Sequence, residues 1–157
     1  MRPSVLLRGW KWRVAAGAAA VLLGGSAAAF TNEPAAAKVT VYKDPNCGCC
    51  GRWVEHLRQN GFEVVARDTS DVDAIKKRYG VPDSLASCHT GIVGGYVIEG
   101  HVPAEDVARL LEEKPRVVGV AVPGMPIGSP GMEGARRDRY RVVSFDRRGG
   151  TTVFATH

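Results

Sequence analysis

The stretch KVTVYKDPNCGCCGRWVEHLRQNG, residues 38–61, decides the fold of this chain. Its first five residues alternate polar and apolar side chains, which predicts a strand, and Asp44-Pro45-Asn46 predicts a turn. Apolar residues then recur at helical spacing until Gly61, which predicts a helix. The point where the strand gives way to the helix carries three cysteines: Cys47, Cys49 and Cys50. Because unpaired N–H groups and the positive end of the helix dipole gather at a helix start, this position favours thiolates.

The residues that follow continue the alternation of strands and helices. Residues 62–66 predict a second strand, and residues 71–79 predict a second helix. This order is the opening of a thioredoxin-like domain, in which Cys47-x-x-Cys50 falls at the usual place of the redox pair. Two short apolar segments joined by Gly94-Gly95 then predict a hairpin over residues 91–98.

The C-terminal third adds elements to that core. Residues 104–113 predict a helix, and residues 141–154 predict a hairpin that extends the sheet. Between them lies a Gly-, Pro- and Met-rich loop, residues 123–133, whose glycines and prolines exclude a regular helix or a central strand. We therefore expect an α/β fold, a thioredoxin-like single domain over residues 38–157 with this loop and the C-terminal β-hairpin as extensions.

Composition and charge indicate one domain that does not bind nucleic acid. The chain has 157 residues, of which 45% are hydrophobic and 24% charged. That length builds one good core and is too short for two. Four of the net charges of +5 come from basic residues within residues 1–29, which contain no acidic residue, so the rest of the chain is nearly neutral, at +1. A nearly neutral domain lacks the basic surface that phosphate backbones require.

Residues 1–29 have the pattern of a secretory signal peptide. Basic residues up to Arg13 precede an apolar run, residues 14–25, and a small-residue site that ends at Ala29. The apolar run is about half of the roughly twenty residues that span a bilayer, so we expect cleavage after Ala29 rather than a membrane anchor. Residues 30–37 are then a short linker, in which Ala35-Ala36-Ala37 is an alternative cleavage site, and the mature form does not span the membrane.

The four cysteines are crowded in an unusual way. In an exported protein the simplest interpretation is two structural disulfides. The adjacent pair Cys49 and Cys50 argues against it, because each would have to bond elsewhere and a Cys47–Cys50 link closes an unusually short loop. In thioredoxin-like domains the segment before the third strand passes beside the CxxC motif and usually carries a cis proline. Here Cys88-His89-Thr90 takes that place, so we expect Cys88 to approach the other three sulfurs.

Taken together, the motifs resemble those of the CopG-like family, periplasmic copper-handling proteins long filed as a domain of unknown function. The resemblance covers essentially the whole mature chain. The stretches that carry it are residues 44–57, 80–82, 87–90, 95–96, 99–103 and 123–133. It implies a thioredoxin-like fold, a periplasmic location, copper as ligand, cysteine thiolates as its holders and a part in copper resistance. The expected partners are copper ions, with periplasmic copper chaperone or efflux components as candidate protein partners and no nucleic acid.

The ligand chemistry agrees with copper independently of the family. Soft thiolates select Cu(I), zinc and iron-sulfur clusters. Adjacent thiolates suit bridging better than a closed tetrahedron around one zinc ion. We therefore expect Cys47, Cys49, Cys50 and Cys88 to hold Cu(I). Up to four Cu(I) ions with four bridging thiolates would sum to zero charge, which a desolvated pocket tolerates. One copper per chain would contradict this cluster hypothesis.

Histidines and methionines are the candidates for additional copper ligands or for groups that contact those ligands. His89 adjoins Cys88, and His101 follows the predicted hairpin, where an ordinary loop histidine is the alternative. Met125 and Met132 lie in the irregular loop, and their thioethers either bind Cu(I) or pack over an apolar edge of the sheet. We expect no direct ligand role for His56, about 10 Å along the helix from Cys49, or for the terminal His157.

Three functions compete at this point. The preferred one is a copper-binding protein that buffers Cu(I) or interconverts Cu(I) and Cu(II); whether it is an enzyme stays open. The alternative is a thioredoxin-like thiol-disulfide oxidoreductase, with Cys47 as nucleophile and Cys50 as the resolving thiol, these two being the catalytic candidates. A third is a disulfide-stapled module that binds another protein, which explains export but not the crowded thiols.

Overall fold

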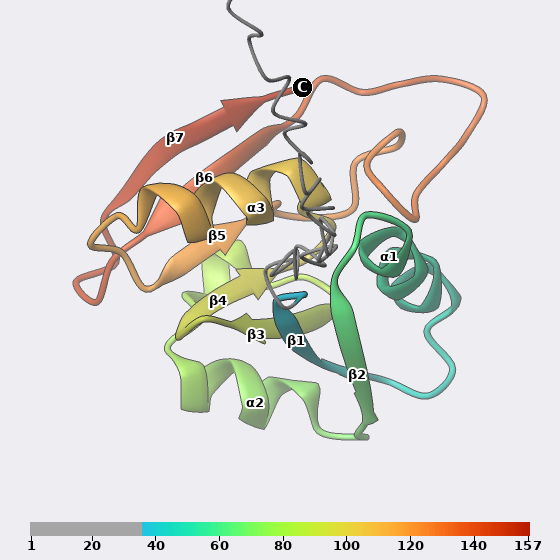
Figure 1. Cartoon of the computed structure of the whole chain (residues 1–157), viewed down its shortest axis with the longest axis horizontal. Coiled ribbons are helices and arrows are strands. Elements are labelled where there is room, and N and C mark those ends of the chain that lie inside the picture. Colours follow the sequence, from blue (N-terminus) through green and yellow to red (C-terminus); the bar gives the residue numbers. More distant parts are fainter. Residues whose placement is uncertain (1–35) are drawn as a thin grey trace, which may run out of the picture. The chain divides into compact units, whose positions relative to one another are not determined.

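A seven-stranded mixed sheet organises the computed structural model, which describes residues 36–157 (Figure 1). The predicted signal peptide, residues 1–29, and most of the predicted linker lie outside the described residues. The strand order is β2-β1-β3-β4-β5-β6-β7. The strands are β1 (Lys38–Lys43), β2 (Glu63–Asp68), β3 (His89–Val93), β4 (Tyr96–Glu99), β5 (Gly119–Ala121), β6 (Arg141–Phe145) and β7 (Thr151–Thr156).

Strand pairing confirms the expected α/β fold. β1 runs parallel to β2 and antiparallel to β3, and β3 forms the predicted hairpin with β4. β6 and β7 form the predicted C-terminal hairpin, which joins the sheet through β5. β5 itself was not predicted. Its three residues are all buried, so they show neither the alternation of a half-exposed strand nor the length of a helix.

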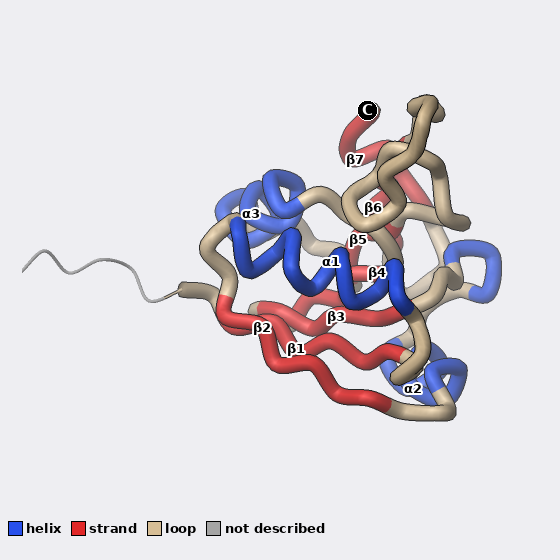
Figure 2. The backbone as a smooth tube through the Cα atoms, turned by 90° about the vertical axis from the view of Figure 1, so that its right-hand side faces the viewer, coloured by secondary structure: helices blue, strands red, loops and turns tan. Residues whose placement is uncertain are grey.

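Two helices cover one face of the sheet and one covers the other (Figure 2). The helices are α1 (Gly48–Gln59), α2 (Val72–Tyr79) and α3 (Ala104–Glu113), with a short 3-10 helix η1 (Asp83–Leu85) before β3. Under α1 and α3 lies the larger hydrophobic cluster, to which Trp53 and Leu57 contribute from α1 and Leu110 from α3. The opposite face packs a smaller cluster around Phe145 and Leu85.

The start of α1 is set by its own cysteines. Cys47 is the N-cap residue, and its Sγ accepts a hydrogen bond of 3.3 Å from the backbone N–H of Cys50. The helix ends at Gln59 with Asn60 as its C-cap, and Gly61 follows with φ 86°, a conformation that glycine adopts without steric cost. The strand-turn-helix prediction for residues 38–61 is therefore confirmed, and it places the cysteines at the end of α1 that faces the C-terminal end of β1.

Among residues 36–157, no helix has the length and the apolar character needed to cross a bilayer.

Candidate metal centre

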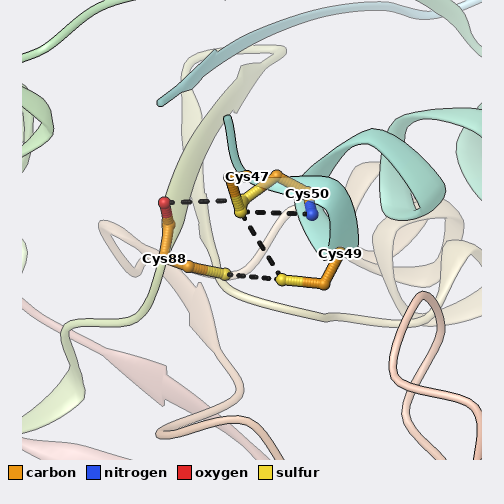
Figure 3. Close-up of side chains that lie close together, drawn as sticks. All are labelled: Cys47, Cys49, Cys50 and Cys88. Carbon is orange, nitrogen blue, oxygen red and sulfur yellow. Dashed lines mark hydrogen bonds between the residues drawn. A yellow bond between two sulfur atoms is a disulfide. The ribbon is translucent and has the colours of Figure 1, made fainter. Parts of the chain in front are cut away.

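The structure brings the four cysteines together from two segments that are 38 residues or more apart (Figure 3). Cys47, Cys49 and Cys50 lie at the start of α1, and Cys88 immediately precedes β3. β1 and β3 pair so that Lys43 lies opposite His89, which places Cys88 beside the turn that leads from β1 into α1. All four Sγ atoms lie within 4.8 Å of one another.

Two of the four sulfurs are bonded to each other. Cys47 and Cys50 form a disulfide, and their Cα atoms are 5.3 Å apart, a separation typical of disulfides. The sequence analysis counted the short loop between Cys47 and Cys50 against this disulfide. The loop does not prevent the bond, because one helical turn brings the two Cα atoms to a distance that a disulfide can span. Cys49 and Cys88 remain free, with their Sγ atoms 4.0 Å apart. In this state the chain offers two free thiols, and the predicted set of four thiolates requires reduction of the disulfide.

Cys49 is the link between the disulfide and the second thiol. Its Sγ lies 3.5 Å from Cys47 Sγ, and since Cys47 carries no proton, the Cys49 thiol is the donor. On the other side of the disulfide, Cys50 Sγ lies 3.7 Å from the carbonyl oxygen of Cys88. The segment that usually carries the cis proline of thioredoxin-like domains thus passes beside this disulfide, and no peptide bond in the described part of the chain is cis.

Two buried histidines also contact Cys88. Cys88 Sγ lies 3.1 Å from His101 Nε2 and 3.3 Å from His89 Nδ1. His101 Nδ1 lies 2.8 Å from the carbonyl oxygen of Pro130, which can only accept a hydrogen bond. Nδ1 therefore carries the ring proton, and the lone pair of Nε2 faces the sulfur. The sequence analysis named His101 as a candidate ligand or a group in contact with the ligands, and the structure places it against Cys88 by the turn that follows β4.

Burial sets the protonation of this group. It raises the pKa of the Cys88 thiol to about 11, with the charge of Cys49 as the next cause. It lowers the pKa of His89 well below 6.5, and His101 and Lys76 act in the same direction. Burial also lowers the pKa of His101 against the opposing hydrogen bond to Pro130. Both imidazoles are therefore neutral at pH 7, with lone pairs available, and Cys88 keeps its proton until a metal ion displaces it.

The Gly-, Pro- and Met-rich loop closes over the same place through its backbone. A Cβ atom on Gly131 would lie 2.8 Å from the Cys49 carbonyl oxygen and 2.9 Å from the Trp53 nitrogen, so only glycine fits against α1 there. Arg52 Nε donates to the Gly131 carbonyl at 3.0 Å. Met132 follows as a half-buried residue, whereas Met125 is 54% exposed. The loop reaches the site, but Met125 faces solvent.

The two remaining histidines have other partners. His56 Nε2 accepts a hydrogen bond of 3.0 Å from the backbone N–H of Ala104 and so ties α1 to the start of α3. His157 Nε2 lies 2.7 Å from Asp106 Oδ2, and its Nδ1 lies 3.8 Å from Glu105 Oε1. The sequence analysis assigned no contact to His157, since nothing local links it to α3.

A buried ion pair that the sequence analysis missed holds the Cys88 segment. Glu99, with no exposed surface, accepts hydrogen bonds from Lys76 Nζ at 2.7 Å, from the Ser87 N–H at 2.6 Å and from Thr90 Oγ1 at 2.7 Å. Ser87 and Thr90 flank Cys88 on both sides, so this carboxylate fixes the backbone that presents the thiol. The family motif around residues 99–103 contains Glu99, but no spacing rule connects it with Lys76.

The donor set fits a soft or borderline metal ion. Four sulfurs and two imidazole nitrogens suit copper and zinc, whereas the site contributes no carboxylate of the kind that Mg²⁺ or Ca²⁺ prefers among its described ligand atoms. A thiolate would cancel the charge of a bound Cu(I) ion, and a complex without net charge suits a site in which the histidines and Cys50 are buried.

Comparisons with known proteins agree with the site. A family model described as "Protein of unknown function, DUF411" matches residues 85–132, which include Cys88 and both buried histidines. No curated protein matches the chain at a significant level. Two solved structures described as copper resistance protein CopG, forms 2 and 1, share 50% identity with this chain. They have TM-scores of 0.74 and 0.72, and the alignments cover 78% and 76% of this chain and 98% and 96% of theirs. The chain therefore belongs to the CopG-like family of copper resistance proteins.

Proposed function

We propose that this protein binds Cu(I) through Cys47, Cys49, Cys50 and Cys88 and contributes to copper resistance, by buffering Cu(I) or by interconverting Cu(I) and Cu(II). The observation that carries the proposal is the convergence of four sulfur atoms within 4.8 Å of one another. Soft thiolates are the ligands that Cu(I) prefers, so four sulfurs in one place are a suitable donor set for it.

Opening the Cys47–Cys50 disulfide completes the donor set. Reduction takes two electrons and two protons and yields two thiols, and bound copper then displaces the protons from all four sulfurs. Up to four Cu(I) ions balance four thiolates, and bridging sulfurs allow the adjacent Cys49 and Cys50 to share ions. The resulting cluster is electrically neutral, which suits a site where Cys50 has no exposed surface.

The same pair of cysteines provides a route for electrons. Two Cu(II) ions and the two thiolates of Cys47 and Cys50 are converted into two Cu(I) ions and one disulfide, and the reverse reaction consumes two Cu(I) ions. Buffering requires only the reduced form, whereas interconversion requires repeated passage between both forms. A stoichiometry of two copper ions per disulfide distinguishes electron transfer from simple binding, and its recurrence over repeated cycles shows turnover.

A second candidate function rests on the disulfide itself. The Cys47–Cys50 pair lies at the start of α1, as the redox pair of a thiol-disulfide oxidoreductase does, and the helix start stabilises a Cys47 thiolate. Such an enzyme needs neither Cys49 nor Cys88. Reduction of a test disulfide by a Cys49→Ser/Cys88→Ser variant at the wild-type rate would favour this function.

Anaerobic titration of the reduced protein with Cu(I), against a competing chelator, tests the proposal. We expect several copper ions per chain in the wild type and a large loss of that capacity in Cys49→Ser and in Cys88→Ser. Ser84→Ala, an exposed residue of η1, is the control and should bind as the wild type does. Weak binding in the wild type, or unchanged capacity in both cysteine variants, would overturn the proposal.

We also propose that residues 1–29 direct export to the periplasm, with residues 30–37 as a linker to the metal-binding domain, residues 38–157. Periplasmic copper chaperones and efflux components are then the candidate protein partners. The intact mass of the protein recovered from the periplasm tests this. A chain that begins at Phe30 supports cleavage after Ala29, and retention of all 157 residues contradicts it.

A further inference from the structure

A basic pocket lies at the end of the sheet opposite the cysteines. Its volume is about 770 Å³, and it is bounded by the C-terminal end of α2, the residues that precede β5 and the turn between β6 and β7. Cys88 precedes the first residue of β3, whereas the pocket reaches Gly95, just beyond the last residue of that strand. In Figure 1 the C-terminal end of α2 and the β6–β7 turn lie on the left, and α1 lies on the right. A ligand in this pocket therefore leaves the cysteines uncovered.

The charge of this pocket is strongly one-sided. Its exposed cationic residues are Lys77, Arg78, Arg116, Arg147 and Arg148. Within the described part of the chain, none of the five forms an ion pair. The one carboxylate in the lining, that of Asp146, accepts hydrogen bonds of 2.7 and 2.9 Å from the backbone N–H groups of Arg148 and Gly150. Five cations thus meet a single carboxylate here, although residues 30–157 as a whole carry a net charge of only +1.

We propose that the basic pocket is a docking site for an acidic segment of a partner protein, that is, a stretch of chain that carries several carboxylates. The inference goes beyond the proposed function, because the pocket contains none of the cysteines and needs no copper. It also narrows the class of protein partner to one that presents such a segment.

The gathering of like charges is unfavourable without a ligand. Cations that share one concave surface repel one another, and such repulsion destabilises the compact state. Several surface cations elsewhere in the chain have a counter-charge, as Lys38 does in Glu63 at 2.9 Å. Departures from the pairing of charges are expected at functional sites, where a ligand supplies the missing group. An acidic segment would supply the counter-charges that the basic pocket lacks.

The type of cation favours carboxylates as the ligand groups. Four of the five cations are arginines, and a planar guanidinium group binds a carboxylate through two parallel hydrogen bonds. The guanidinium carbon of Arg78 lies 6.0 Å from the centroid of the Tyr79 ring, a cation–π contact that keeps this charge beside the pocket. The cations come from three separate segments, so they can contact successive carboxylates of one chain.

The floor of the pocket favours a chain segment over a bare ion or a membrane. Val97 is buried and Val117 and Val118 are half-buried in the lining, so the methylene groups of a bound chain have apolar surface to contact. Binding to a bilayer interface uses protruding apolar side chains beside the cations. The large hydrophobic side chains that the described residues expose are Met125 and Val153, and neither lines this pocket.

NMR titration of the isotope-labelled, metal-free protein with acetylated, amidated hexaglutamate tests the proposal. We expect one saturable site with a Kd below about 1 mM. The amide signals that shift should belong to residues 77–80, 116–118 and 146–150 rather than to the start of α1. Raising the NaCl concentration from about 20 to about 200 mM should weaken binding at least roughly tenfold, because salt screens exposed charges.

Charge reversal separates the pocket from the overall charge. Arg147→Glu/Arg148→Glu should weaken peptide binding at least about tenfold, because two attractive contacts become repulsive. The matched control, Arg139→Glu/Arg141→Glu, makes the same change in net charge at two exposed arginines outside the pocket. It should weaken binding less than about twofold at roughly 0.1 M salt. All four side chains are exposed, so circular dichroism should show folded variants; Arg116→Gln, a milder change, should weaken binding by a smaller factor.

The outcomes also distinguish the partner class. Absence of hexaglutamate binding overturns the proposal, and so does an equal loss in both double variants, because net charge alone would then explain the binding. Vesicles of phosphatidylcholine and phosphatidylglycerol are the second probe. Co-sedimentation that disappears in Arg147→Glu/Arg148→Glu, without peptide binding, overturns the proposal in favour of a membrane surface. The peptide titration involves no copper, so its failure leaves the proposed function intact, and weak copper binding leaves the docking site intact.

Discussion

Replacing Glu99 with glutamine should destabilise this protein far more than its change of one atom suggests. The carboxylate has no exposed surface, and it accepts three hydrogen bonds, one of them from the ammonium group of Lys76 at 2.7 Å. Glutamine keeps the shape and one oxygen, but it loses the charge. Lys76, whose side chain is 7% exposed, is then a buried cation without a counter-charge, and the new amide NH2 faces the donor of Thr90.

The expected cost follows from the burial of the pair. Removing one partner of a buried ion pair typically costs about 3–5 kcal/mol, because the other charge is left without compensation. Domains of this size are stable by about 5–15 kcal/mol, so Glu99→Gln should consume a large part of the free energy of unfolding. Because Thr90 loses its acceptor and the Ser87 N–H keeps only a neutral one, the segment that carries Cys88 should also loosen before the rest of the chain unfolds.

Urea unfolding of the metal-free protein, followed by circular dichroism, measures this cost. The matched control is Glu63→Gln, which breaks the ion pair with Lys38 on the surface, where both side chains are more than half exposed. Exposed pairs of this kind contribute about 0–1 kcal/mol, so the control should unfold almost as the wild type does. A cost below about 1 kcal/mol for Glu99→Gln would refute the reasoning.

A second variant tests the cause. Lys76→Met removes the cation, and in the double variant Lys76→Met/Glu99→Gln no unpaired charge remains in the core. The double variant should therefore be more stable than Glu99→Gln alone, and the two single costs should exceed the combined cost by at least 1 kcal/mol, as a rough threshold for directly coupled residues. Additive costs would show that the lost packing, rather than the uncompensated charge, is responsible.

Three further predictions concern the site. With a pKa of about 11, about 0.1% of Cys88 is thiolate at pH 8, roughly 200-fold less than in a free cysteine. Alkylation followed by mass mapping should therefore find Cys88 modified slowly, at a rate that rises about tenfold per pH unit. A fast, pH-independent reaction contradicts this. Because burial lowers the pKa of His89, the unfolded chain binds more protons below its usual value of 6.5 than the folded chain does. The free energy of unfolding should therefore fall from about pH 6.5 to pH 5, and urea titrations of His89→Phe should show a shallower fall; an equal slope would exclude this histidine as the cause. Gly131→Ala should destabilise the fold by roughly 2–4 kcal/mol in the same assay, because φ is +85° and the added Cβ would press on Cys49. Gly149→Ala, with φ +80° and open space, should cost only about 1–2 kcal/mol, and equal costs would show that the contact with α1 is unimportant.

Much of the fold was predictable because its signals are local. The alternation in residues 38–42, the turn at residues 44–46 and the helical spacing up to Gly61 each depend on near neighbours, and the structure confirms them. β5 was missed because three buried residues carry no period, and it becomes a strand only through pairing with β4 and β6. The expected approach of Cys88 to α1 came from the order of the elements, since the third strand of such a domain returns beside the first.

The sequence by itself determined the thioredoxin-like order of strands and helices, the cysteine pattern at the start of α1 and the kinship with copper resistance proteins, because these reside in composition, spacing and short motifs. Only the tertiary structure decided that Cys47 and Cys50 are bonded and that His101 turns its lone pair toward Cys88. It also decided that Glu99 holds the segment that carries Cys88 by a hydrogen bond to Ser87. The physical reason is that each of these features joins groups brought together by packing, and the direction of a buried hydrogen bond depends on every neighbour that the fold supplies.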